Sequence, residues 1–200
     1  MKFFCLNIHT ATERRTHCRE QFTRAGIDVE FVRALDTRMN HIRHQNANYK
    51  VGQLGCMLSH MRLIEEVGRH DISPAVIFED DIRLVDGFRE RLDEALLTLP
   101  DDWDLAFVGW WPEYFNYNQL RAKPVSEHWV RMTQGVLWGC HCYMVNGSRG
   151  ADRALEILQP ITGHVDDVLL RAIVECRIKG YFLREPLADQ MGTFQSQTQG

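Results

Sequence analysis

A wholly apolar run at residues 75–78, with the sequence AVIF, is followed directly by three acidic residues, Glu79, Asp80 and Asp81. A short continuous apolar run is typical of a strand buried on both faces, which requires helices on each side of its sheet. Three carboxylates at the end of such a strand repel one another, and a divalent cation is the usual remedy. The pattern therefore indicates a metal site, or else a solvated acidic turn after a core strand.

Strand geometry decides which of the three acids would act together. Side chains alternate across an extended strand, so Glu79 and Asp81 would face one side and Asp80 the other. Hard carboxylate oxygens suit Mn²⁺, Mg²⁺ or Ca²⁺ better than zinc, and two of them leave positions open for water or a diphosphate. The CHC segment at residues 140–142 does not predict a zinc site, because no C-x-x-C or H-x-x-x-H pair accompanies it.

Composition bounds the domain count and the partners. The 200 residues, 44% of them hydrophobic, suffice for one domain over 1–200, with 195–200 as a frayed tail. The net charge of −4 argues against nucleic acid as a partner. Six cysteines, mostly inside apolar segments, are typical of reduced core thiols. With no signal peptide or membrane span expected, we predict a cytoplasmic location, in the cytosol or at the cytoplasmic face of a membrane.

Hydrophobic periodicity predicts alternating strands and helices. The expected strands are residues 2–8, 29–34, 75–78, 103–109, 140–145 and 181–183, and the expected helices are 11–25, 54–64, 88–99, 151–158 and 165–179. The TATE segment at 10–13 has the spacing of a capping box, and Asp86 is the expected cap of the third helix. This order predicts an α/β fold with a mainly parallel central sheet flanked by helices on both faces. Ligands of such sheets bind at the carboxyl ends of the strands, where the acidic triplet lies.

Basic and small residues near the other strand ends are candidates for ligand contact. Arg14 and Arg15 follow the first strand and can pair with a phosphate, or form a solvated basic face. Gly55 and Ser59 are four residues apart on a predicted helix, where small side chains permit close approach by a ligand or another helix. His60, beside them, is by itself more typical of a structural histidine.

Five aromatic residues fall within eight positions at 110–117, among them Trp110, Trp111 and Tyr114. Sugar rings stack on indole and phenol rings, so we predict that these three side chains bind an acceptor. The alternative is a small aromatic core under the loop. Asp166 and Asp167 begin a predicted helix, where one carboxylate can cap free amides and the other can serve as a general base.

Taken in chain order, these segments resemble glycosyltransferase family 25. The shared features are Asn7 with Arg14 and Arg15, the RALD step at 33–36, GC-x-LSH at 55–60, IFEDD at 77–81 and VD at 165–166. The LSH step, followed about twenty residues later by an apolar strand and the acidic triplet, is the most specific of them. The family includes bacterial lipooligosaccharide galactosyltransferases and collagen galactosyltransferase domains.

The resemblance implies a GT-A type fold and transfer of a hexose, galactose or glucose, from a UDP-sugar to a hydroxyl of a saccharide or glycoprotein acceptor, with inversion. It also implies a bound Mn²⁺ or Mg²⁺, with Asp81 as the leading ligand and Glu79 or Asp80 assisting. Asp166 matches the later family aspartate and is a candidate base, and Asp167 is the alternative. The implied nucleotide-sugar-binding residues are Asn7, Arg14, Ala34, Asp36, Ser59 and His60.

Two other functions stay open at the level of the sequence. A sugar nucleotidyltransferase also uses carboxylate-bound metal, but normally has a glycine-rich basic loop after its first strand, and the NIHT segment at 7–10 offers neither feature. A non-catalytic carbohydrate-binding module, or an inactive transferase-like domain, would use the aromatic segment to bind sugar. In that case the acidic triplet would be structural only.

Overall fold

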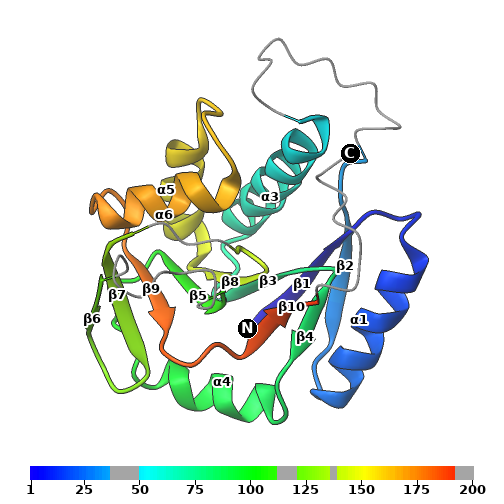
Figure 1. The fold of residues 1–200 in the computed structure, drawn as a ribbon, viewed down its shortest axis with the longest axis horizontal. Helices are drawn as coiled ribbons and strands as arrows, with labels where there is room; N and C mark the ends of the chain where they lie inside the picture. The colour runs from blue at the N-terminus through cyan, green and yellow to red at the C-terminus, as the bar shows by residue number, and fades with distance from the viewer. Residues whose placement is uncertain (37–49, 112–120, 136–138, 192–200) are drawn as a thin grey trace.

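A ten-stranded sheet forms the centre of the molecule in the computed structural model, which describes residues 1–36, 50–111, 121–135 and 139–191 (Figure 1). Its main path has the order β2-β1-β3-β8-β5-β9-β7-β6, and β10 pairs with both β4 and β5. The strands are β1 (Lys2–Asn7), β2 (Val29–Arg33), β3 (Ala75–Glu79), β4 (Ile82–Leu84), β5 (Leu105–Gly109), β6 (Arg121–Pro124), β7 (Trp129–Gln134), β8 (Cys142–Val145), β9 (Gly180–Leu183) and β10 (Ala188–Gln190).

Helices cover both faces of this sheet. They are α1 (Thr12–Arg24), α3 (Val51–Arg69), α4 (Phe88–Leu96), α5 (Gly147–Leu158) and α6 (Val165–Val174). In Figure 1, α3, α5 and α6 lie above the sheet, whereas α4 lies below it and α1 beside β2. The predicted α/β architecture with helices on both faces is therefore confirmed.

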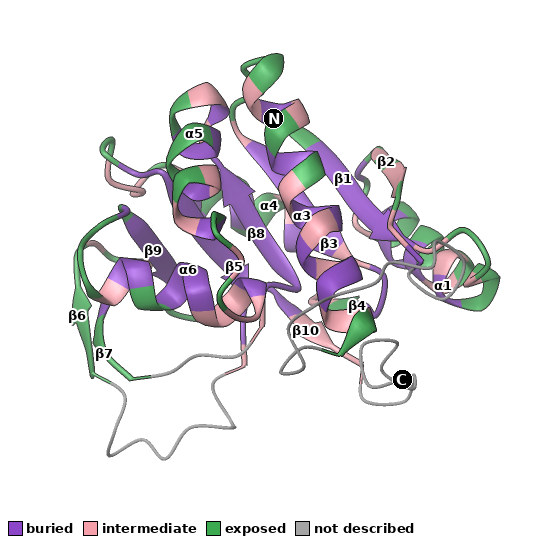
Figure 2. Ribbon diagram, turned by 90° about the horizontal axis from the view of Figure 1, so that it is seen from above, coloured by how far each residue is buried: buried purple, intermediate pink, exposed green. Residues whose placement is uncertain are grey.

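The burial pattern explains this layering, because alternate residues of one strand enter different cores. Phe4 and Ile77 pack in the core under α3, α5 and α6, whereas Phe3 and Phe78 pack in the core with α1 and α4. All four side chains are buried, and Figure 2 shows the central strands as the most buried part of the fold. A strand with both faces covered must be apolar throughout, which is why the AVIF run is continuous.

The sheet is mixed in direction. β1 is parallel to β2 and β3, and β5 is parallel to β9, but β8 is antiparallel to both β3 and β5. Between β5 and β8 the described residues form the antiparallel pair β6 and β7, with no helix. A parallel strand needs a long crossover, usually a helix, so the chain enters β8 in the opposite direction.

Two of the predicted helix caps are wrong. α1 begins at Thr12 after Ala11, with no side-chain cap hydrogen bond, so residues 10–13 do not form a capping box. The N-cap position of α4 is Gly87, at φ +67°, rather than Asp86. In both helices the N-cap position is one residue later than the polar residue that was expected to occupy it.

β10 comes close to the end of β5 because Gly109 has no side chain. A Cβ built at Gly109 would lie 2.8 Å from the Ala188 Cβ and 2.8 Å from the His141 Cδ2. Gly109 thus lets three segments converge beside the carboxyl end of β3. Among the described helices, none is both long and apolar enough to cross a bilayer.

Candidate functional site

The acidic triplet lies in a tight turn rather than along a continuous strand. β3 ends at Glu79, Asp80 and Asp81 form the turn, and β4 begins at Ile82. The extended conformation, on which pairing of Glu79 with Asp81 depended, therefore stops at Glu79. Instead, Asp80 and Asp81 both reach the guanidinium of Arg14, whereas Glu79 reaches His60 on α3.

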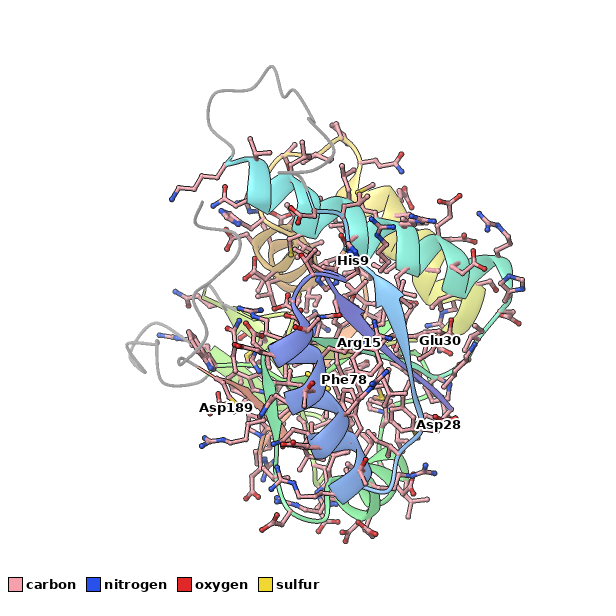
Figure 3. The ribbon with its side chains drawn as sticks, turned by 90° about the vertical axis from the view of Figure 1, so that its right-hand side faces the viewer. His9, Arg15, Asp28, Glu30, Phe78 and Asp189 are labelled. Atoms are coloured by element: carbon pink, nitrogen blue, oxygen red, sulfur yellow. The ribbon has the colours of Figure 1, made fainter. Side chains whose placement is uncertain are left out.

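Arg14, on α1, is buried between the two aspartates. Its Nη1 lies 2.5 Å from Asp80 Oδ1 and 3.4 Å from Asp81 Oδ2, and Asn7 Nδ2 donates to Asp80 Oδ2 at 2.7 Å. Arg15, the next residue, instead stacks over Phe31 of β2, with its Cζ 4.5 Å from the ring centroid; Figure 3 shows it on the α1 side of that strand. Of the two candidate arginines, only Arg14 thus contacts the acidic triplet.

Asp81 carries the least compensated charge of the triplet. Its Oδ2 accepts a hydrogen bond from Gln190 Nε2 at 2.9 Å, but its buried Oδ1 has no partner within the described residues. Burial, followed by the charge of Glu79, raises the pKa of Asp81 to about 7, against the opposing effects of Gln190 and Arg14. A cation placed beside this oxygen would oppose the shift, because it favours the charged carboxylate.

A buried hydrogen-bonded chain runs from Glu79 into the core. His60 Nε2 lies 3.3 Å from Glu79 Oε1, and His60 Nδ1 lies 2.9 Å from the Tyr143 hydroxyl of β8. Burial alone would raise the pKa of Glu79, but the hydrogen bond with His60 and the electrostatic effects of His60, His141 and Arg14 lower it below its ordinary value. Glu79 is therefore held as a carboxylate.

Cys56, one turn before His60 on α3, lies beside this hydrogen-bonded chain. Among the described residues, one ligand atom each from Cys56, His60 and Glu79 lie within 4.8 Å of one another. Burial, then the charges of Glu79 and Asp166, raise the pKa of the Cys56 thiol well above its usual range. The thiol is neutral in this environment.

Ser59 ties α3 to the segment that follows β2. Its hydroxyl accepts from the Leu35 N–H at 2.8 Å and donates to the Gly55 carbonyl at 2.6 Å. Ala34 N–H donates to the Asn7 carbonyl at 3.0 Å, so the end of β1 fixes the same segment. These contacts set the backbone on which Ala34 and the buried Asp36 lie.

Asp166 and Asp167 lie in the first turn of α6, one and two residues after its first residue, Val165. Asp166 accepts from the Gly139 N–H at 3.2 Å and from the Asp167 N–H at 3.0 Å, while His164 occupies the N-cap. Burial raises the pKa of Asp166, although the bond from Gly139 opposes the shift. Asp166 is thus a carboxyl group whose proton affinity is above that of an exposed aspartate.

The two tryptophans have different surroundings. Trp110 is buried, packs edge-on against Phe182 and donates from Nε1 to the Leu183 carbonyl at 2.9 Å. Trp111 is half-buried and donates to Asp189 Oδ1 at 2.7 Å. Tyr114, the third predicted acceptor residue, lies outside the described residues. The small aromatic core described above as the alternative therefore accounts for Trp110, and Trp111 keeps a partly open surface.

The comparison with family sequence models decides the family. The model described as "Glycosyltransferase family 25 (LPS biosynthesis protein)" matches residues 1–169, which include the whole acidic triplet and both α6 aspartates. The chain belongs to glycosyltransferase family 25. The family match and the fold together support a glycosyltransferase.

Individual family 25 proteins are similar to this chain over only part of their length. An inactive glycosyltransferase 25 family member 3 of Mus musculus is 43% identical over 125 residues, covering 53% of this chain. A glycosyltransferase 25 family member of Aedes aegypti is 25% identical over 179 residues, or 76% of this chain. Procollagen galactosyltransferase 1-A of Xenopus laevis is 26% identical over 125 residues, or 53%. The chain spans 21%, 27% and 20% of these relatives' own lengths, respectively.

A solved structure shows the same fold. The crystal structure of a glycosyltransferase involved in the glycosylation of the major capsid of PBCV-1 matches with a TM-score of 0.56 at 6% sequence identity. The match covers 100% of this family 25 chain and 98% of the other. The predicted GT-A type of α/β fold is thereby confirmed.

Several residues of the site escaped the sequence analysis of this family 25 chain. Gln190 comes from a three-residue strand that no periodic pattern marks, and Cys56 was noted only as part of a motif. Tyr143 could have been found from strand alternation, because residues 141, 143 and 145 share one face of the predicted strand at 140–145. Nothing in the sequence links that face to His60.

Proposed function

We propose that this domain transfers a hexose from a UDP-sugar to a hydroxyl group of a saccharide or glycoprotein acceptor, in a metal-dependent reaction with inversion. The family and the GT-A fold support the glycosyl transfer itself. The observation that carries the finer proposal is the pair Asp80 and Asp81 at the carboxyl end of β3, where Asp81 keeps a buried oxygen without a partner.

The residues present fit a hard divalent cation. Asp81 offers its unpartnered Oδ1, Asn7 offers a second unpartnered buried oxygen, and burial, followed by the charges of Glu79 and Asp80, raises the pKa of Asp81. Mn²⁺ or Mg²⁺ would be held by Asp81 with help from Asp80 or Glu79, as oxygen ligands suit these ions. When bound, the ion supplies positive charge that offsets the negative charge developing on the diphosphate leaving group.

The donor would lie along the ends of β1 and β2. Asn7, Arg14, Ala34, Asp36, Ser59 and His60 are the proposed binding residues. The hydrogen bonds of Asn7 with Ala34 and of Leu35 with Ser59 support this role, because they join three elements around one segment. Arg14 is already paired with Asp80, so its role is to position the carboxylates and to lower their repulsion, rather than to bind a phosphate alone.

Inversion needs a general base that accepts the proton of the acceptor hydroxyl, on the face of the sugar opposite the leaving diphosphate. Asp166 supports this role because burial raises its pKa, which makes it a stronger base than an exposed aspartate. Asp167, next to it, stays the alternative. The acceptor would contact the partly open surface of Trp111, and the predicted contributions of Trp110 and Tyr114 stay proposals.

The test is donor turnover. The full chain with Mn²⁺ and UDP-galactose or UDP-glucose should release UDP slowly without acceptor, and EDTA should abolish the release. Asp81→Asn should lower this release at least about 100-fold, since removal of one charged group at a reacting centre has effects of this size. Asp152→Asn, an exposed aspartate of α5, is the matched control and should keep full activity. Full metal-dependent turnover by Asp81→Asn would refute the assignment.

A second function is favoured by one comparison. The mouse relative at 43% identity is named inactive, so a domain that binds sugar without transferring it is the alternative proposal. It predicts no UDP release with any donor, and a sugar affinity that is unchanged by Mn²⁺ and by UDP. The same measurements on the wild-type chain therefore separate the two functions.

A further inference from the structure

Cys56, His60 and Glu79 bring together three different kinds of metal ligand. Cys56 and His60 are four residues apart and lie on one face of α3, and Glu79 faces them from the end of β3. A thiol sulfur, an imidazole nitrogen and a carboxylate oxygen from these residues lie within 4.8 Å of one another. We propose that these three residues form a second cation site, selective for a thiophilic divalent ion such as Zn²⁺; Glu79 then belongs to this site, and Asp80 rather than Glu79 assists Asp81 at the hard-ion site.

The donor set selects the ion. Thiolate and imidazole ligands favour zinc, whereas Mg²⁺ and Mn²⁺ prefer oxygen. Three protein ligands with one open position is a common arrangement for zinc in proteins. Bond lengths of about 2.0 to 2.3 Å place neighbouring ligand atoms of a tetrahedral zinc ion roughly 3.5 Å apart. Closing the group from 4.8 Å therefore requires side-chain movements of about an ångström, which rotation at Cys56 and Glu79 can supply.

The surroundings of His60 already hold its ring for metal binding. Its Nδ1 lies 2.9 Å from the Tyr143 hydroxyl oxygen, which accepts a hydrogen bond in the tautomer with the proton on Nδ1; that tautomer leaves the Nε2 lone pair for an ion. That ion would replace the His60 contact with Glu79, and the Cys56 thiol proton would leave to solvent as the sulfur–zinc bond forms. A partner on the far ring nitrogen is the usual support of a metal-bound histidine.

Charge and access also suit a cation. Glu79 and Asp166 both place negative charge near the Cys56 sulfur, and Asp81 and Asp80 add smaller contributions. His60 is buried, whereas Cys56 and Glu79 are half-buried, so the group is partly open to solvent. The inference does not depend on the transfer reaction, because it concerns ion binding by the free chain.

The experiment is a titration of the reduced, metal-free full chain with Co²⁺, followed by Zn²⁺. Co²⁺ should produce a thiolate-to-cobalt charge-transfer absorption that saturates at one ion per chain, and Zn²⁺ should displace it. Cys56→Ser should abolish the absorption, whereas Cys176→Ser, which changes an exposed cysteine elsewhere, should keep it. Tyr143→Phe should weaken cobalt affinity by about 10-fold, as loss of a partner of a metal-bound histidine does.

A second measurement needs no variant. Zn²⁺ should protect Cys56 from alkylation by N-ethylmaleimide in the wild-type chain, as read by peptide mass spectrometry, while Cys176 reacts equally with and without the ion. Absence of the cobalt absorption in the wild type, its persistence in Cys56→Ser, or equal alkylation of Cys56 with and without Zn²⁺ would overturn the proposal. None of these results bears on Mn²⁺-dependent UDP release, so the two proposals fail independently.

Discussion

A single guanidinium, that of Arg14, is shared between the carboxylates of Asp80 and Asp81. Both aspartates are buried, so solvent screens their repulsion poorly. One positive charge offsets one of the two negative charges, and Glu79 adds a third nearby. The residue-level chemistry of the site is therefore an excess of buried negative charge, which costs stability in the free protein and favours a bound cation.

This excess predicts a pH-dependent stability cost at Asp81. Its folded pKa of about 7 lies above the value in the unfolded chain, so the folded state binds the proton more tightly. The contribution of Asp81 to stability is therefore lost as the pH rises from about 4 through 7. Without metal, Asp81→Asn should raise the free energy of unfolding by about 4 kcal/mol at pH 8, because each pKa unit corresponds to about 1.4 kcal/mol, and by little at pH 4.

Urea unfolding at the two pH values measures the difference. Mn²⁺ with UDP should stabilise the wild-type chain but not Asp81→Asn, since the variant lacks the charged ligand. Asp152→Asn should behave as wild type at both pH values. An Asp81→Asn variant that is less stable than wild type at pH 8 would contradict the raised pKa.

Asp166 gives a second pH dependence, that of the activity, which requires the unprotonated carboxylate. A general base must be unprotonated, so activity falls as the pH drops through its pKa. Because burial raises the pKa of Asp166, the acidic limb of kcat/KM should lie above the ordinary aspartate value of about 3.9. Asp166→Asn should lower kcat by about 10²- to 10⁴-fold and remove this limb. The same loss in Asp167→Asn, with Asp166→Asn active, would assign the base to Asp167.

At the scale of elements, the site depends on hydrogen bonds that join a helix to a strand end. Ser59 of α3 holds the backbone at Leu35, and this bond spans 24 residues of chain. α3 also brings Cys56 and His60 toward the end of β3. The position of α3 relative to β2 therefore sets the shape of the proposed donor site.

Removal of the Ser59 hydroxyl tests whether the bond between α3 and the segment after β2 shapes the proposed donor site. Ser59→Ala leaves the Leu35 N–H without its partner, which costs about 1 to 2 kcal/mol. If the segment at 34–36 contacts the nucleoside, the Kd for UDP in the presence of Mn²⁺ should rise about 10-fold. Ser148→Ala, near the start of α5, is the matched control and should leave the Kd unchanged. An unchanged Kd in Ser59→Ala would exclude this segment from the nucleotide site.

Sequence patterns found the helices and the central strands, but missed the antiparallel pair β6 and β7 and the three-residue strands β4 and β10. The continuous AVIF run and the periodic helix at 51–69 specify their structures because burial constrains every position. β4 and β10 have three residues each, too few for a period, and their pairing with each other comes from the tertiary fold. The same limit applies to the site: the acidic triplet was predicted, but Gln190, which donates a hydrogen bond to Asp81, lies in β10.

For the whole molecule, residues 170–191 contribute two strands, β9 and β10, to the same sheet as the residues before them. The family match ends at residue 169, yet β9 lies inside the sheet, between β5 and β7, and is buried throughout. β10 adds Gln190, which contacts Asp81. The sheet and the site are both incomplete without this segment.

A truncation series tests whether the residues after 169 are needed for folding. A chain ending at residue 169 should show no cooperative thermal unfolding, because β5 and β7 lose the strand that joins them. A chain ending at residue 194, which removes only the tail predicted to be frayed, should melt within about 2 °C of wild type. Circular dichroism during heating distinguishes them, and a cooperative transition in the shorter chain would show that residues 1–169 fold independently.

The reversed direction of β8 has a consequence for how the domain can diversify. Because β8 is antiparallel to β3, the residues before it, including Gly139 and His141, meet the end of β3 from the opposite chain direction. Gly139 contacts Asp166, on the side away from the Arg14 pair. Insertions or substitutions ahead of β8 would therefore alter the surroundings of Asp166 and leave the β1 and β3 ends in place. Under the proposed function, such domains could change the acceptor that they glycosylate and keep the donor contacts.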